Sequence, residues 1–159
     1  MESSCQSSFL NCGKTYKVLI PNQLSLNSVP LKIASVKVDV QNIKNPRVLI
    51  NYSQNCNVVV NGYNILISVT FELVRKSIQT GEEERLEKWT FKVSEGIPTV
   101  VEELVTIEPL VLNYCDSLNN SFEDAFIYTI QIIDLKSNNA SYTLDSQQIS
   151  AIACSGSSN

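Results

Sequence analysis

Short runs of β-branched and aromatic residues follow one another along almost the whole chain from Tyr16 onward. In several runs apolar and polar residues alternate with a period of two, which is typical of a strand with one buried face. Asn, Ser, Gly and Pro separate the runs and mark turns. We expect strands over residues 16–20, 31–40, 47–52, 57–60, 64–77, 85–93, 99–114, 125–135 and 141–153, with Pro109 as a candidate break.

The alternation also predicts which side chains share a buried face. These are Ile65, Ile67, Val69, Phe71, Leu73, Trp89, Phe91, Val93, Phe126, Tyr128, Ile130 and Ile132. The turn signal at residues 79–82 predicts that the strands on either side of it form a long hairpin. The strand 125–135 also has apolar residues on its second face, which favours a central position in a sheet or a second buried surface.

So many short strands with turn signals at short spacing predict an all-β chain that folds as a two-sheet β-sandwich of jelly-roll type. The helical alternatives at 82–89 and 121–126 are too short to dominate. We expect a flexible Cys-bearing N-terminal arm over residues 1–15, one sandwich domain over 16–154 and a polar tail over 155–159.

Composition excludes several classes of protein. A chain of 159 residues can bury about 70% of its unfolded surface, so it needs no disulfides to fold. The net charge is −4 with Lys and Arg scattered along the sequence, which argues against a nucleic-acid partner. No apolar stretch approaches the length of a membrane-spanning helix.

The sequence offers no catalytic constellation. It contains no histidine, which excludes triad hydrolysis and His-containing metal sites, and we expect no enzyme activity and no cofactor. The carboxylates Glu82, Glu83, Glu84 and Glu87 favour a solvated hairpin tip over an acid–base or calcium site. Trp89 alternates with Phe91, which favours a core position over a sugar-stacking platform.

Five cysteines are present, and no two have the C-x-x-C spacing of redox or zinc-ribbon motifs. They are Cys5, Cys12, Cys56, Cys115 and Cys154. A core position fits Cys154 best, because free cysteine usually packs as a small apolar side chain. The other four have polar neighbours, such as the asparagines beside Cys56, and these argue against simple core packing.

Cys5 and Cys12 lie in MESSCQSSFLNCGK, a polar segment without the basic and apolar regions of a signal peptide. When extended, these 14 residues reach roughly 45 Å, more than the width of a small domain. An odd number of cysteines cannot pair completely within one molecule. We therefore expect disulfides between subunits, with a loose N-terminus carrying idle thiols as the alternative.

Three stretches, NCGKTYKV (11–18), LKIASVKVDVQNIKNPRVLINYSQN (31–55) and SVTFELVRKSIQTGEEERLEKWTFKV (68–93), resemble a family of small clostridial proteins. Its members pair a Cys-Gly-Lys/Arg start with an IASV-x-VD strand, a P-(K/R)-V-x-I-x-(F/Y)-S strand and an F-x-L-x-R…W-x-F hairpin. The resemblance continues loosely through LNYCDS (112–117) and AFIYTIQIIDL (125–135). It implies no catalytic residues.

The plan of a polar Cys-bearing arm before a β-sandwich is also similar to subunits of bacterial endospore appendages. In those fibres a jelly-roll domain polymerises, and its N-terminal arm forms disulfides with neighbouring subunits. The similarity implies Cys5 and Cys12 as donors, and Cys56, Cys115 or Cys154 as acceptors. The arm of this chain has no adjacent cysteine pair, a departure that leaves the acceptor open.

We therefore expect a structural homo-oligomer, a disulfide-crosslinked fibre or coat subunit at the spore surface, made in the mother-cell cytoplasm without a signal peptide. Exposed strand edges would pair between copies, and contacts that do not close would give fibres. The alternative is a monomeric carbohydrate- or surface-binding β-sandwich module. Assembly predicts covalent ladders under oxidising conditions, whereas a binding module predicts a single species.

Overall fold

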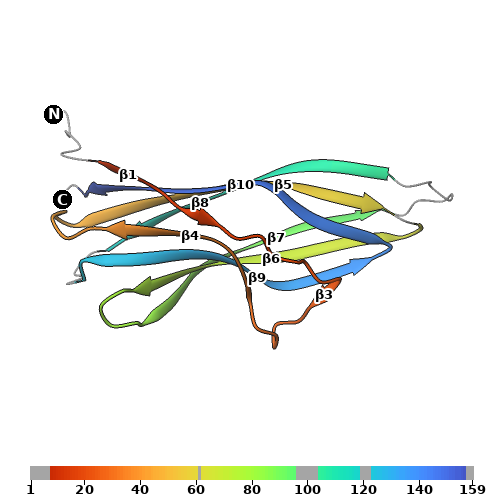
Figure 1. The fold of residues 1–159 in the computed structure, drawn as a ribbon, viewed down its shortest axis with the longest axis horizontal. Helices are drawn as coiled ribbons and strands as arrows, with labels where there is room; N and C mark the ends of the chain where they lie inside the picture. Colours follow the sequence, from red (N-terminus) through yellow and green to blue (C-terminus); the bar gives the residue numbers. More distant parts are fainter. Residues whose placement is uncertain (1–7, 61, 96–103, 119–122, 157–159) are drawn as a thin grey trace.

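The computed structural model describes residues 8–60, 62–95, 104–118 and 123–156, which form ten strands (Figure 1). The strands are β1 (Phe9–Cys12), β2 (Lys14–Thr15), β3 (Gln23–Leu24), β4 (Leu31–Asp39), β5 (Pro46–Val60), β6 (Ile65–Ser77), β7 (Glu83–Glu95), β8 (Leu104–Ser117), β9 (Ala125–Asn138) and β10 (Ala140–Ser155). The described part of the chain contains no helix long and apolar enough to cross a membrane. The prediction of an all-β fold is confirmed.

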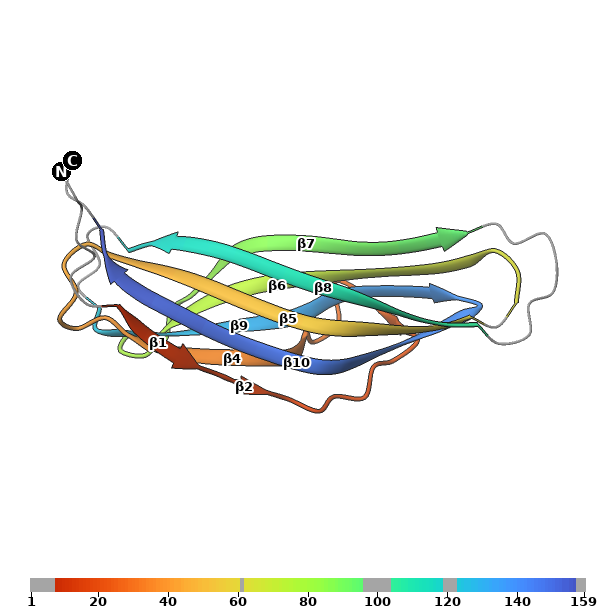
Figure 2. The same ribbon diagram turned by 90° about the horizontal axis from the view of Figure 1, so that it is seen from above.

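Two antiparallel sheets pack face to face, and their strands run along the long axis of the molecule (Figure 2). Sheet A has the order β1-β10-β5-β8, and sheet B has the order β2-β4-β9-β6-β7, with β3 also pairing with β9. The pairs β1/β10, β4/β9, β5/β8 and β6/β7 are nested in the sequence. The chain is thus one long hairpin folded over on itself, with its tip between β6 and β7, which is the jelly-roll arrangement.

The predicted buried faces meet between the sheets. In β6 every second residue from Ile65 to Leu73 is buried, and in β9 the same holds from Phe126 to Ile132. Trp89 and its alternate neighbours in β7 are partly buried against this core, as expected for an outer strand. β9 lies between β4 and β6, so its predicted central position is confirmed.

The predicted strand over 16–20 is wrong. These residues form no strand, and one bond from the Tyr16 amide to the carbonyl of Ile33 continues the pairing beyond β2. Val18 and Ile20 are partly buried against the core, while Leu19 is 97% exposed. Alternating burial therefore produced a strand pattern in a segment that pairs with no described strand.

Two predicted strands, 47–52 and 57–60, are one continuous strand, β5. The polar residues between them alternate like the rest, because Gln54 is buried while Ser53 and Asn55 face outward. β8 also continues through Pro109, which proline permits because β8 is an outer strand with fewer ladder bonds to lose. Residues 99–103 of the expected strand lie outside the described residues.

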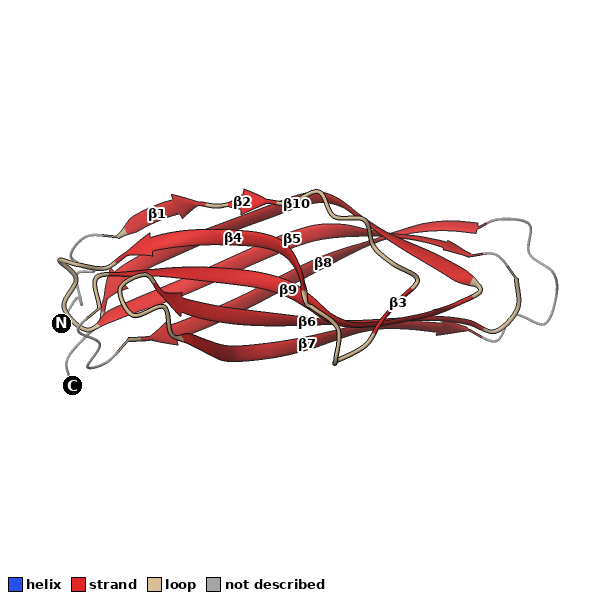
Figure 3. Cartoon of the chain, turned by 60° about the horizontal axis from the view of Figure 1, so that its bottom comes forward, coloured by secondary structure: helices blue, strands red, loops and turns tan. Residues whose placement is uncertain are grey.

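The second half of the expected N-terminal arm lies in the sheets. β1 pairs with β10 in sheet A, and β2 pairs with β4 in sheet B, so the segment spans the two layers at one edge (Figure 3). The crossing point is Gly13, whose amide donates to the Ile149 carbonyl at 2.9 Å. A Cβ at this position would lie 2.3 Å from the Ser35 carbonyl oxygen, so only glycine fits.

A charged group ties the two sheets together near the hairpin tip. Arg75 of β6 donates to Asp116 of β8 at 2.6 Å, and Tyr128 donates to the same carboxylate oxygen at 2.8 Å. Arg75 also pairs with Glu84 and lies over the Phe126 ring, 5.3 Å from its centroid. The acidic residues at 82–84 and 87 are exposed, as predicted for a hairpin tip.

Candidate assembly surface

Sheet A ends in two strands, β1 and β8, that each pair with one described strand only. Both carry exposed apolar side chains: Phe9 and Leu10 on β1, and Val105, Ile107 and Val111 on β8, the last three 55%, 62% and 63% exposed. An outer strand with unpaired backbone groups and apolar side chains is a template for pairing with another chain.

The two outer strands each present a thiol on the same face of sheet A. The register places Leu10, Ile152, Leu49 and Cys115 in one row across the four strands, and Cys12, Ser150, Asn51 and Asn113 in the next row of that face. Directly paired residues point to the same side of a sheet, and this side is the one away from the core. Cys12 and Cys115 are both exposed free thiols.

These thiols are too far apart to pair within one molecule. Cys12 and Cys115 are separated by three strand spacings, about 14 Å, whereas a disulfide needs Cα atoms within about 7 Å. Cys154 of β10 is half-buried on the same face, four residues beyond the partner of Cys12, or about 13 Å along the strand. Among the described residues no disulfide is formed.

Cys56 lies in the core, so the inference from its polar neighbours is wrong. It is fully buried on the inner face of β5, and Asn55 and Asn57 point to the opposite face. Its sulfur lies 3.2 Å from the Tyr142 hydroxyl and accepts from Gln54 Nε2 at 3.4 Å. Burial raises the pKa of the Cys56 thiol, which keeps it protonated and unreactive. Cys56 is thus excluded as a disulfide acceptor in the folded subunit.

The same buried network fixes the middle of sheet A. Gln54 accepts from the Tyr52 hydroxyl at 2.6 Å and donates to the Tyr142 hydroxyl at 2.9 Å. Gln147 donates to Tyr52 at 2.8 Å from the irregular stretch of β10 where the register shifts between Asp145 and Gln148. The buried side-chain oxygens and nitrogens of this network all have hydrogen-bond partners, so it holds the strands together as a structural element.

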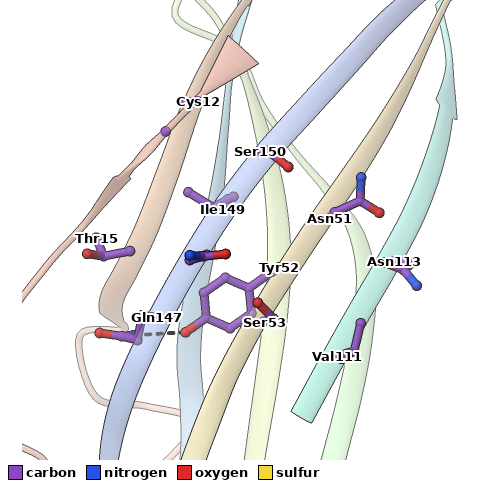
Figure 4. A pocket seen from close by; sticks show the side chains of 12 residues that line it. Cys12, Thr15, Asn51, Tyr52, Ser53, Val111, Asn113, Gln147, Ile149 and Ser150 are labelled. Carbon is purple, nitrogen blue, oxygen red and sulfur yellow. Dashed lines mark hydrogen bonds between the residues drawn. The ribbon is translucent and has the colours of Figure 1, made fainter. Parts of the chain in front are cut away.

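A groove of about 720 Å³ crosses the outer face of sheet A next to this irregular stretch (Figure 4). Its walls come from the N-terminal segment, β10, β5 and β8, and include Cys12, Thr15, Asn51, Ser53, Val111, Asn113, Gln148 and Ser150. The described lining is uncharged. The groove extends from Cys12 on one outer strand to Val111 and Asn113 on the other.

The sequence singled out the thiols but missed the apolar residues of β8. In the run 104–112 apolar residues occur at both odd and even positions, so both faces of the strand carry apolar side chains. This pattern could have indicated that apolar side chains on the outer face are exposed in the monomer. Cys5 lies outside the described residues. Among the described residues, no group of three or more acidic or cysteine side chains is placed to hold a metal ion.

One protein-family model, described as a domain of unknown function (DUF4489), matches residues 5–154. The match covers both sheets and the two outer strands of sheet A, and its description names no ligand, partner or reaction. A search of curated proteins found no match.

Proposed function

The chain belongs to the DUF4489 family, whose description names no activity. We propose from the geometry that the protein is a structural subunit that polymerises through sheet A. The observation that carries the proposal is the pair of outer strands, β1 and β8, each with exposed apolar residues and one exposed thiol. The similarity to endospore appendage subunits extends the proposal to a fibre or coat at the spore surface.

Strand direction supports head-to-tail pairing. All neighbours in sheet A are antiparallel, so β1 and β8 run in opposite directions. If β8 of one copy meets β1 of the next, the antiparallel alternation continues without interruption. Such a contact uses two different surfaces and does not close on itself, which is the condition for a fibre. The added main-chain hydrogen bonds are those of strand addition to an open sheet edge.

Thiol positions support covalent locking of this contact. Cys12 and Cys115 face the same side, so in the joined sheet they can lie directly opposite each other, with Cα atoms about 5 Å apart. That spacing suits a disulfide. Each bond removes two protons and two electrons from the thiol pair, and a low-molecular-weight disulfide or molecular oxygen accepts the electrons.

The test is negative-stain microscopy and non-reducing gels of the wild type beside Cys12→Ser and Cys115→Ser, with Cys154→Ser as the matched thiol control. A Cys5→Ser, Cys12→Ser double variant tests whether Cys5 forms the crosslink when Cys12 is absent. We expect wild-type filaments with covalent ladders, and loss of the ladders in the variants at positions 12 and 115 only. Peptide mapping should join Cys12 to Cys115.

An edge variant tests assembly separately from the crosslink. Ile107→Lys places a charge on the exposed side of β8 and should abolish filaments while the monomer stays folded by circular dichroism. Single particles and one monomer band for the oxidised wild type would reject the assembly proposal. Ladders that depend on Cys154 instead would reject the assignment of Cys115 but keep assembly.

One observation favours the alternative, a monomeric carbohydrate-binding module. The groove on sheet A is lined by amide and hydroxyl side chains such as Asn51, Asn113 and Gln148, which can bond to sugar hydroxyls. No aromatic ring is placed flat on its surface among the described lining residues, because Tyr52 is buried. A monomeric wild type that binds a neutral polysaccharide, and loses binding on Asn51→Ala, would establish this function instead.

A further inference from the structure

The cations that are scattered in the sequence gather on the outer face of sheet B. On β4, for example, Lys37 points outward between the buried Val36 and Val38. The cross-strand register places seven further Lys and Arg side chains of sheet B on the same side as Lys37. This basic face contains Lys14, Lys32, Lys37, Lys76, Arg85, Lys88, Lys92 and Lys136.

The basic face has a charge opposite to that of the whole chain. It holds eight of the 12 Lys and Arg residues and four of the 16 acidic residues, namely Asp39, Glu72, Glu83 and Asp134. Its formal charge is therefore 8 − 4 = +4, whereas the chain carries −4 and the remainder −8. A folded protein with this separation attracts an anion to one face and repels it from the others.

A buried carboxylate holds part of the basic face in position. Glu72 is 1% exposed, and its Oε2 accepts from Gln131 Nε2 at 2.9 Å. Its other oxygen has no hydrogen bond and lies 3.5 Å from Lys88 Nζ and 3.8 Å from Arg85 Nε. Lys14, Lys32, Lys37 and Lys92 form no ion pair with a described residue, so their charge is available to a ligand.

The basic face is hollowed around Lys32. Two adjoining depressions of about 340 and 470 Å³ share Lys32, Val74, Glu83 and Gln131 in their walls. One extends to Tyr16 and Lys76, and the other extends to Arg85 and to Pro30 in the connection before β4. Together they form a trough across the strands with cations along it.

We propose that the basic face binds a linear acidic polysaccharide along this trough. Carboxylate groups of such a polymer can pair with Lys32 of β4 and Arg85 of β7 in the trough and with Lys37 farther along β4. These cations are spread over the face instead of converging on one point. The pattern suits a repeating anion better than a single small one. The inference is independent of the assembly proposal, because it uses the other sheet and no cysteine.

The side chains favour an acidic polysaccharide over a nucleic acid. Binding of single strands relies on exposed aromatic rings for base stacking. Among the described lining residues of the trough the one aromatic side chain is Tyr16, whose hydroxyl is hydrogen-bonded to the Ser35 hydroxyl at 2.7 Å. Seven of the eight cations are lysines, which act as point charges, whereas bidentate recognition of phosphates and bases uses arginine.

Charge-reversal pairs in the full chain test the proposal. Lys32→Glu with Lys37→Glu changes the basic face, and Lys44→Glu with Arg47→Glu makes the same change in net charge on the β4–β5 turn and sheet A. Binding to polygalacturonate would be measured by calorimetry at two salt concentrations. Its methyl ester, which keeps the chain but masks the carboxylates, is the matched ligand.

We expect the first pair to weaken polygalacturonate binding by about tenfold or more, and the control pair by about twofold or less. If the first pair folds poorly, Lys92→Glu on the outer strand β7 removes another cation of the basic face, and its binding to polygalacturonate is measured instead. Equal losses in both pairs, or equal binding of the methyl ester, would overturn the proposal. Tighter binding of single-stranded DNA than of polygalacturonate would also overturn it and assign the face to nucleic acid.

Discussion

Gly13 allows the N-terminal segment to cross closely from one sheet to the other. Its backbone lies against β4 and β10 with no space for a side chain. We predict that Gly13→Ala destabilises the protein by about 1–3 kcal/mol, because the new methyl group forces the segment away from Ser35 and Ile149. Hydrogen exchange should show faster exchange at residues 9–12, and unfolding in urea gives the loss of stability.

Thr15→Ala is the control for that prediction, because Thr15 lies in the same segment with an exposed side chain. Its stability and exchange should match the wild type. Unchanged hydrogen-exchange protection of residues 9–12 in Gly13→Ala would show that the close packing of Gly13 against Ser35 and Ile149 does not contribute to the stability of this segment.

Cys56 shows why local sequence can mislead at the level of single residues. Its neighbours in the sequence are asparagines, yet in a strand the adjacent side chains point to the opposite face. The alternation that correctly predicted the buried side of β6 applies equally here. What the sequence could not supply was continuity, because Ser53, Gln54 and Asn55 read as a break between two strands.

Individual strands depend on a few contacts between layers, and the pairing of Arg75 with Asp116 is one. It joins β6 of sheet B to β8 of sheet A, with side chains 18% and 7% exposed. We predict that Asp116→Asn lowers the free energy of unfolding by about 2–3 kcal/mol, because it leaves the partly buried Arg75 charge with only the exposed Glu84 as a carboxylate partner.

Glu84→Gln is the matched control, because Glu84 pairs with the same arginine but is 63% exposed. Glu84→Gln should lower the free energy of unfolding by at most about 1 kcal/mol. Urea unfolding of both variants and the wild type gives the comparison. Equal costs would mean that burial does not decide the strength of this pair.

The pairing of strands was predictable where partners are close in the sequence and hidden where they are distant. The β6–β7 hairpin follows from one turn signal and two alternating runs. By contrast, nothing near residues 9–12 indicates that they pair with residues 150–153. The segment 16–20 failed for the same reason, since a strand requires a neighbouring backbone that no local pattern reveals.

Alkaline pH should unfold the whole molecule. Burial, as the main cause, raises the pKa of Tyr52, Tyr128 and Tyr142 above the ordinary value of 10.0, with the Asp116 charge adding to the effect at Tyr128. The unfolded chain then loses these protons before the folded one does. The stabilisation is complete below pH 10.0 and is lost progressively as the pH rises towards the higher folded values.

Each such group lowers the free energy of unfolding by about 1.4 kcal/mol per pH unit above pH 10. We expect urea midpoints to be constant from pH 7 to 9 and to fall steeply by pH 11. Tyrosinate absorbance at 295 nm should show the three buried groups ionising together with unfolding. Ionisation of all tyrosines in a still-folded protein would contradict this.

The distribution of charge is also a property of the whole molecule. Eight cations from five strands form one face only after the register is set, and their spacing in the sequence looks random. The same holds for the thiols Cys12 and Cys115, which are 103 positions apart in the sequence and lie on the same face of sheet A. Sequence patterns identified the residue types, and the topology decides which act together.

The nested order of the strands has a consequence for synthesis. A ribosome delivers β1 first and β10 last, so the first strand waits for nearly the entire chain before its partner exists. The hairpin of β6 and β7 can form early, whereas closure of sheet A depends on the longest loop in the molecule. Throughout translation, nascent β1 therefore exposes an unpaired edge, its apolar side chains and Cys12 to other polypeptides made nearby.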